Sequence, residues 1–250
     1  MNTLENKVAI ITGAGSGIGK AAALLFAQEG AKVVVSDIAV ENGKSVVEEI
    51  RNKGGEAIFV KADTSSPEEN EALVKATLEK FGKLDIAVNN AGIGGPLGET
   101  GAYPLDGWRK VIDINLSGVF YGMHYQLAAM EQNGGGSIVN IASILGMVGT
   151  RLSPAYVAAK HGVVGLTKTT ALEYAPKNIR VNSVGPGYIR TPLVENALDE
   201  ATLQYLVGLH PIGRLGTSEE VAELILWLGS SKSSFVTGSY YAVDGGYLAQ

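Results

Sequence analysis

Thr12-Gly13-Ala14-Gly15-Ser16-Gly17-Ile18-Gly19 is the segment of the chain that says most about its fold. It follows a short apolar run, Val8 to Thr12, of the kind that forms a buried strand, and it leads into a helical pattern from Ile18 to Gln28. Glycines here allow positive φ and carry no side chain, so backbone N–H groups and a helix N-terminus can approach a phosphate. The segment predicts a dinucleotide site, with a tight strand–helix turn as the alternative.

The glycine spacing is specific. It is Gly13-x-x-x-Gly17-x-Gly19 and departs from the common G-x-G-x-x-G fingerprint. A nucleoside-triphosphate loop is excluded, because Ala14 and Ala21 stand where that motif needs Gly and Ser or Thr.

Short β-branched runs alternate with amphipathic stretches along the whole chain. Repeated βα units with nearly continuous apolar strands predict an α/β fold, a Rossmann-type doubly wound parallel sheet of about seven strands with helices on both faces. We expect one NAD(P)-binding domain over residues 1–250, with a substrate lid in the irregular segment 188–216. The expected strands are Val8–Thr12, Lys32–Ser36, Ala57–Lys61, Asp85–Val88, Ser137–Ile141, Arg180–Val184 and Tyr240–Val243, and the longest expected helix is Leu105–Gln132.

The amino-acid composition argues against several classes of function. The 250 residues include 33 glycines, nearly twice the average share of about 7%. The absence of cysteine excludes disulfides, zinc–thiolate sites and a cysteine nucleophile. A net charge of −5 without a basic run argues against nucleic-acid binding. The apolar run 8–11 is too short for a signal-peptide core or a membrane span, so we expect a cytoplasmic protein with no membrane partner.

Asp37 ends the second expected strand, 18 residues after Gly19. A carboxylate there can accept hydrogen bonds from both ribose hydroxyls of an adenosine, and it would repel a 2′-phosphate. Asp37 therefore predicts that the protein uses NAD(H) in preference to NADP(H), with a solvent-facing helix cap as the alternative role of this residue.

Four polar residues suggest acid–base chemistry. Tyr156 and Lys160 lie four residues apart in an expected helix and so share a face. A neighbouring ammonium favours the phenolate of a tyrosine and lowers its pKa. Ser143 follows an expected strand, and Asn115 falls inside an expected helix, where a buried amide needs partners. The alternatives are a surface pair at positions i and i+4 for Tyr156 and Lys160, a turn residue for Ser143 and a buried helix kink for Asn115.

These residues, in this order, resemble the short-chain dehydrogenase/reductase family across essentially the whole chain. Asp63, the run Asn89-Asn90-Ala91-Gly92 and Pro186-Gly187 complete the pattern. The resemblance implies that Tyr156 is the acid in ketone reduction and the base in alcohol oxidation, and that Ser143 orients the carbonyl. It implies that Lys160 binds the nicotinamide ribose and lowers the pKa of Tyr156, and that Asn115 holds a relay water.

The same resemblance implies a cofactor site without a metal. Asp63 would touch the adenine amine, and the segment after Pro186-Gly187 would hold the carboxamide. The three histidines show no ligand spacing and are expected to be structural. The implied cofactor residues are Gly13, Ser16, Gly17, Ile18, Gly19, Asp37, Ile38, Asp63, Thr64, Asn90, Ala91, Gly92, Tyr156, Lys160, Pro186, Gly187, Ile189 and Thr191.

The substrate is less determined. An apolar pocket favours bulky or aromatic ketones over sugars, and the sequence looks like bacterial secondary-alcohol dehydrogenases and ketone reductases. A 3-oxoacyl-acyl-carrier-protein reductase is the alternative, and a non-catalytic NAD(H) sensor is a remote one. The resemblance also implies a homotetramer. The expected substrate contacts are Ile93, Ser143, Ile144, Leu145, Leu152, Tyr188, Leu193 and Leu206.

Overall fold

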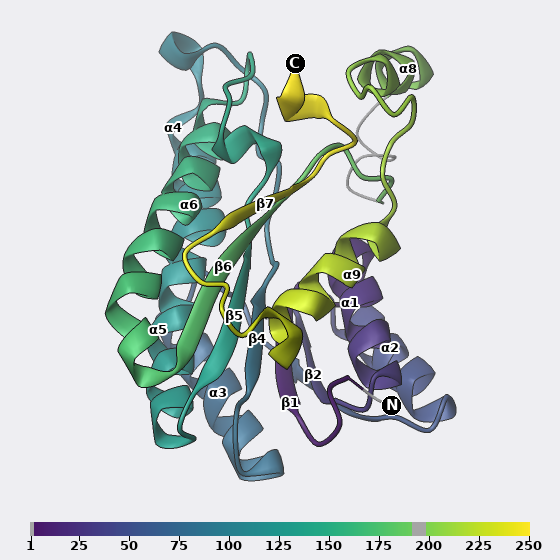
Figure 1. The fold of residues 1–250 in the computed structure, drawn as a ribbon. Coiled ribbons are helices and arrows are strands. Elements are labelled where there is room, and N and C mark those ends of the chain that lie inside the picture. Colours follow the sequence, from purple (N-terminus) through teal and green to yellow (C-terminus); the bar gives the residue numbers. More distant parts are fainter. Residues whose placement is uncertain (1–2, 192–198) are drawn as a thin grey trace.

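A computed structural model describes residues 3–191 and 199–250. Its strands form one parallel sheet, as the sequence predicts, and their order in the sheet is β3-β2-β1-β4-β5-β6-β7 (Figure 1). The strands are β1 (Val8–Thr12), β2 (Lys32–Asp37), β3 (Glu56–Lys61), β4 (Ile86–Asn89), β5 (Gly136–Ile141), β6 (Ile179–Pro186) and β7 (Tyr240–Val243). The strand order reverses between β1 and β4, and ligands of such sheets bind at that point, beyond the carboxyl ends of the strands.

Helices cover both faces of the sheet (Figure 1). One core cluster joins the sheet to α1, α2 and α9, and a second joins it to α3, α5 and α6. Both layers are apolar where they meet the strands, which explains why the strands read as unbroken Val- and Ile-rich runs. The helices are α1 (Gly17–Gln28), α2 (Val40–Asn52), α3 (Pro67–Phe81), α4 (Leu105–Ile112), α5 (Gly118–Gln132), α6 (Pro154–Tyr174), α8 (Glu200–Gly208) and α9 (Ser218–Gly229).

The single helix expected over residues 105–132 is wrong in one respect. α4 and α5 are joined by a π-helical segment, Asp113–Ser117, which contains Asn115. π-Helical turns are rare and occur mostly at functional sites. The helical pattern of the sequence runs through this segment without a break, so only the structure reveals it.

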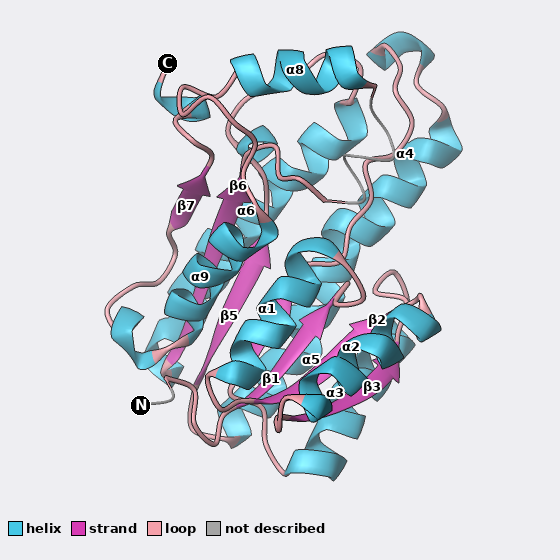
Figure 2. Cartoon of the chain, turned by 90° about the vertical axis from the view of Figure 1, so that its right-hand side faces the viewer, coloured by secondary structure: helices cyan, strands magenta, loops and turns pink. Residues whose placement is uncertain are grey.

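The segment 188–216 was expected to be irregular. This expectation is wrong in part, because the segment contains the helix α8 (Figure 2). Asp199 begins this helix, and its side chain accepts a hydrogen bond from the backbone N–H of Thr202 at 2.8 Å. The signal was present in the sequence as an Asp–Glu helix start. In Figure 2, α8 lies beyond the carboxyl ends of the strands, on the side where a ligand of this sheet would bind.

Candidate active site

The glycine loop is joined to the end of β4 by hydrogen bonds. The Thr12 hydroxyl accepts the backbone N–H groups of Asn90 at 3.0 Å and Ala91 at 3.1 Å, and the Asn90 amide donates to the carbonyls of Thr12 and Gly13. A Cβ on Gly19 would collide with the Gly13 carbonyl and lie 2.6 Å from Asn90 Nδ2. Only glycine therefore fits at position 19, where α1 starts close against the loop.

The N-terminus of α1 is open to an anion. Ser16 is its N-cap residue, yet its side chain makes no capping hydrogen bond. Gly13 and Gly17 have φ of +62° and +52°, the left-handed conformation that favours glycine. Unsatisfied N–H groups at a helix start attract phosphate through hydrogen bonds and the helix dipole. The loop thus fits a pyrophosphate at the switch point between β1 and β4.

Asp37 lies directly against this loop. Its Oδ2 accepts the backbone N–H of Gly15 at 2.8 Å, and its Oδ1 accepts the N–H of Ala39 at 2.8 Å. The N-cap residue of α2 is Ala39, so Asp37 does not cap that helix through the usual position. Ile38, the next side chain, is exposed. This places a carboxylate and an apolar side chain beside the phosphate loop, where an adenosine would lie.

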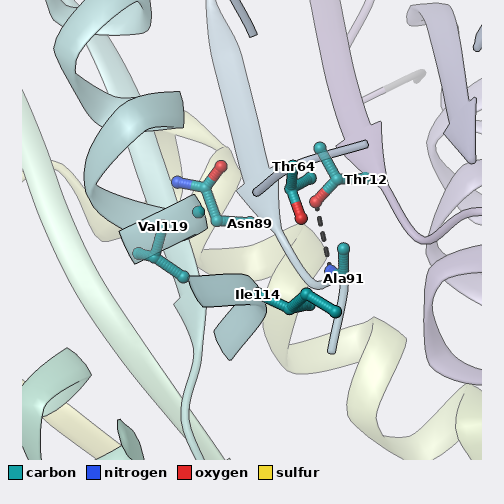
Figure 3. A pocket seen from close by; sticks show the side chains of 7 residues that line it. Thr12, Thr64, Asn89, Ala91, Ile114 and Val119 are labelled. Carbon is teal, nitrogen blue, oxygen red and sulfur yellow. Dashed lines mark hydrogen bonds between the residues drawn. The ribbon is translucent and has the colours of Figure 1, made fainter. Parts of the chain in front are cut away.

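The region beyond β3 supplies the other predicted adenosine contacts. The Asp63 carboxylate accepts the N–H and the hydroxyl of Ser65 at 2.9 and 2.7 Å. Thr64 is buried, and its carbonyl lies close to Gly118 at the start of α5. Figure 3 shows Thr64 beside a small pocket at the ends of β1 and β4, with the hydrogen bond from Ala91 to Thr12. Its lining residues are Thr12, Thr64, Asn89, Ala91, Ile114, Gly118 and Val119.

Lys160 is almost completely buried, with 4% of its surface exposed. Its Nζ donates to the carbonyl of Ile141 at 2.7 Å and lies 5.5 Å from the centre of the Tyr156 ring. Burial lowers the pKa of Lys160 to about 8. A surface pair, the alternative interpretation of Tyr156 and Lys160, is therefore excluded.

Ser143 lies next to Tyr156 at the end of β5. Burial raises the pKa of Tyr156, and the hydrogen bond between Ser143 and Tyr156 opposes that rise. The lowering of this pKa by Lys160 stays a prediction. Because the Ser143 hydroxyl is paired with the phenol, a substrate oxygen would meet both groups together.

Asn115 is fully buried, and its amide is held at both ends by one residue. Its Oδ1 accepts the N–H of Ile93 at 2.9 Å, and its Nδ2 donates to the carbonyl of Ile93 at 2.8 Å. A Cβ on Gly92 would lie 3.2 Å from Asn115 Oδ1 and 3.8 Å from Lys160 Nζ. The four predicted catalytic residues thus gather at one place, and the relay water at Asn115 stays a prediction.

The chain after β6 returns to the glycine loop. Gly187 donates its N–H to the carbonyl of Val243 at 2.9 Å, and Ile189 bridges to Gly216. A Cβ on Gly17 would meet the Thr191 methyl group at 3.3 Å. Thr191 therefore faces the phosphate loop, and the contact of Pro186, Gly187, Ile189 and Thr191 with the carboxamide stays a prediction.

His210 ties α8 to this segment. Its Nε2 accepts the N–H of Tyr188 at 3.2 Å, so its Nδ1 carries the hydrogen that is donated to the Leu206 carbonyl at 2.7 Å. The ring is buried, and the neutral tautomer satisfies both nitrogens, in agreement with the structural role expected. A cavity of about 300 Å³ lies beside it, with Tyr188, Ile212 and Val243 in its wall.

The predicted substrate contacts differ in how far they are buried. Ile144, Leu145 and Leu206 are buried, whereas Leu152 is exposed with φ of +66°. Ile93 and Tyr188 are partly buried at the same edge of the sheet, and Leu193 lies outside the described residues. The sequence interpretation missed exposed apolar side chains on the same segments. They are Leu97, Met147, Val148 and Tyr205, which apolar composition alone does not separate from core residues.

Among the described residues, no three His, Asp or Glu side chains are placed to share a metal ion. Within residues 3–191 and 199–250, no helix has the length and apolar character needed to cross a bilayer.

A doubly wound sheet with these groups at its carboxyl edge defines a class of oxidoreductases, enzymes that pass hydride to or from NAD(H) or NADP(H). A family model described as enoyl-(acyl carrier protein) reductase matches residues 13–248. A cyclohexanol dehydrogenase of Acinetobacter sp. (strain SE19) is 55% identical over 249 residues, which cover 100% of this chain and 98% of that protein.

Two further similarities cover nearly the whole chain. A 3-oxoacyl-acyl-carrier-protein reductase of Thermotoga maritima is 43% identical over 98% of this chain and 99% of its own length. The crystal structure of levodione reductase superposes with a TM-score of 0.94 at 39% identity, covering 98% of this chain and 99% of that one. The chain belongs to the short-chain dehydrogenase/reductase family, which confirms the fold and the enzyme class expected from the sequence.

Proposed function

We propose that the protein interconverts a bulky or cyclic secondary alcohol and its ketone with NAD(H). The observation that carries this proposal is the grouping of Ser143, Tyr156 and buried Lys160 beside the glycine loop. An isolated buried lysine is unfavourable for folding, and such groups are concentrated at functional sites. The glycine loop with its open helix start and Asp37 fits a dinucleotide at the adjoining position.

The residues divide the chemistry between them. The bound nicotinamide supplies or accepts the hydride. In reduction, the Tyr156 hydroxyl gives its proton to the ketone oxygen, and in oxidation the phenolate takes it back. Ser143 donates a hydrogen bond to the same oxygen and fixes its position. The Lys160 ammonium favours the phenolate, and its hydrogens not used by Ile141 remain for the ribose hydroxyls.

Asp37 supports NAD(H) over NADP(H), because a 2′-phosphate would bring negative charge against its carboxylate. We expect a higher kcat/KM with NADH than with NADPH, and Asp37→Ala should narrow that ratio about ten-fold or more. Asp106→Ala is the matched control, since it removes one exposed acidic charge from the first turn of α4. An NADPH preference in the unaltered protein would contradict this assignment.

Exposed apolar side chains support a bulky substrate. Leu97, Met147, Val148, Leu152 and Tyr205 come from the three segments expected around the substrate. Cyclohexanol dehydrogenase is the more similar of the two curated relatives named above, and a ring alcohol would match such surroundings. A panel of cyclic and aromatic ketones, acetoacetyl thioesters and sugars tests the proposal. Preference for the thioester with NADPH would favour the acyl-carrier-protein alternative.

Tyr156→Phe separates an enzyme from a cofactor-binding sensor. It should abolish ketone turnover while the protein still binds NADH, because the ring stays and only the acid is lost. Turnover unchanged by Tyr156→Phe would overturn the assigned acid.

We further propose that the chain forms one domain and assembles as a homotetramer. β7 pairs with β6 after the chain has passed through α9, which packs on α1, so the last strand closes the same unit. Phe120 on α5, Leu172 on α6 and Phe235 before β7 are at least half exposed, and such side chains suit contact with further copies. Multi-angle light scattering gives the number of chains, and a monomer would contradict the assembly.

A further inference from the structure

Tyr240, on the edge strand β7, reaches across β6 to the catalytic region. Its hydroxyl donates to the main-chain carbonyl of Ser143 at 3.0 Å, a contact between residues 97 positions apart. The ring lies over Gly185 of β6, where a Cβ would overlap the ring and hydroxyl of Tyr240. Glycine at position 185 thus leaves the space through which Tyr240 reaches Ser143.

The peptide of Ser143 is held from two sides. Its carbonyl accepts the Tyr240 hydroxyl and also the N–H of Gly146 at 2.9 Å, so both lone pairs are used. Its backbone is extended, and its Oγ accepts the N–H of Leu145 at 3.1 Å while it pairs with Tyr156. Rotation of this peptide would turn the hydroxyl away from the phenol.

We propose that Tyr240 is a positioning residue, which fixes the Ser143 peptide so that the serine hydroxyl faces Tyr156 and the substrate oxygen. The proposal rests on the proposed function, in which Ser143 and Tyr156 act on one carbonyl oxygen. Tyr240 acts through Ser143, because its hydroxyl donates to the Ser143 carbonyl. Burial, with a smaller contribution from Asp244, raises the pKa of Tyr240 to about 12, so its hydroxyl remains a donor at every pH at which the enzyme would be assayed.

Tyr240→Phe removes this hydrogen bond and keeps the ring over Gly185. We expect kcat for ketone reduction to fall about five-fold, the effect of losing one neutral hydrogen bond, with the KM for NADH unchanged. The pKa of Tyr156 should rise, because the bond from Ser143 that lowers it is weakened. The rise of alcohol oxidation with pH, which needs the phenolate, should therefore move to higher pH.

Tyr241→Phe is the matched control. Its ring packs at 5.8 Å from that of Trp227, on the other face of the strand, and the variant should keep the wild-type kcat and pH profile. Gly185→Ala is a second, independent perturbation. It removes no hydroxyl group from the protein but displaces the Tyr240 ring together with its hydroxyl, and it should change kcat and the Tyr156 pKa in the same directions as Tyr240→Phe.

The pKa of Tyr156 can be followed without any substrate by NMR titration of protein labelled at tyrosine Cζ with carbon-13, its signal being the one absent in Tyr156→Phe. A wild-type Tyr156 pKa and kcat in both Tyr240→Phe and Gly185→Ala would overturn the positioning role. An equal change in Tyr241→Phe would do the same. If no ketone is reduced but Tyr240→Phe shifts the Tyr156 titration, the proposed function fails and the positioning role stands.

Discussion

Lys160→Met should make the protein more stable and inactive at the same time. Burial lowers the pKa of Lys160 from 10.5 to about 8. At 1.36 kcal/mol per pKa unit, the charged side chain therefore costs about 3 kcal/mol of folding free energy at neutral pH. Methionine has a similar length and no charge. It loses the hydrogen bond to the Ile141 carbonyl, which contributes about 1.5 kcal/mol, so the variant should gain about 2 kcal/mol at pH 7.

The stability advantage of Lys160→Met over the wild type should decrease as the pH rises above 8. Between pH 8 and 10.5 the unfolded lysine binds a proton that the folded lysine lacks, so the free energy of unfolding of the wild type rises with pH through this window. Below pH 8 the full cost is present. The wild type should therefore recover about 2 kcal/mol between pH 8 and 9.5, where the two proteins become equally stable.

Urea unfolding of both proteins at pH 7, 8.5 and 10 measures this difference. Lys168→Met, an exposed lysine on the same helix, is the control, and its effect should be small and independent of pH. Ketone turnover is measured on the same preparations and should be lost only in Lys160→Met. A variant that is less stable than wild type at pH 7, or a difference that stays constant up to pH 10, would show that the burial of Lys160 carries no such cost.

Two other substitutions test the loop and the core. Gly19→Ala should raise the Kd for NADH at least ten-fold in a fluorescence titration, because its Cβ would collide with the Gly13 carbonyl, whereas Gly101→Ala, which meets no atom within 4 Å, should bind normally. Equal binding by both variants would contradict the close approach at Gly19. Gln126→Leu should lower the free energy of unfolding by about 2–4 kcal/mol, because the buried amide of Asn89 loses partners at 2.8 and 3.1 Å, and a urea midpoint like that of the wild type would refute this.

Patterns local in sequence predicted most of the fold. β1 and β7 have the bounds expected from their apolar runs, and α9 starts with the Thr217–Glu220 capping box that the sequence shows. β2, β3, β5 and β6 are one or two residues longer than expected at one or both ends, and β4 is shifted by one residue, because hydrogen bonding and not apolar character sets the ends of a strand. The π-helical segment at Asn115 was not predictable in this way, because the helical pattern of the sequence runs through it and the partner of Asn115, Ile93, is distant in sequence.

In the candidate site, too, residues in local patterns were predictable and residues that depend on distant contacts were not. Gly13, Tyr156 and Lys160 were identifiable because their spacing reflects one loop or one helical turn, and Asp37 because it ends the second apolar strand. Tyr240 was not, because its partner lies 97 residues away and its one local sign is that position 185 is a glycine. The substrate contacts could not be fully predicted, because the sequence of an apolar loop does not reveal that Ile144 is buried while Met147 is exposed.

The polar groups of the site are held by backbone atoms before any ligand arrives. Asn115 is fixed by Ile93, Lys160 by the Ile141 carbonyl, and the Ser143 peptide by Tyr240. Fixed groups need little reorganisation during the reaction, which lowers its barrier. The Lys160 ammonium is less well stabilised, because Ile141 accepts one of its three hydrogens and burial disfavours its charge. Ribose hydroxyls that accept the remaining hydrogens would stabilise the ammonium. The bound cofactor would therefore lower the free-energy cost of burying the Lys160 charge, and it is this charge that binds the cofactor.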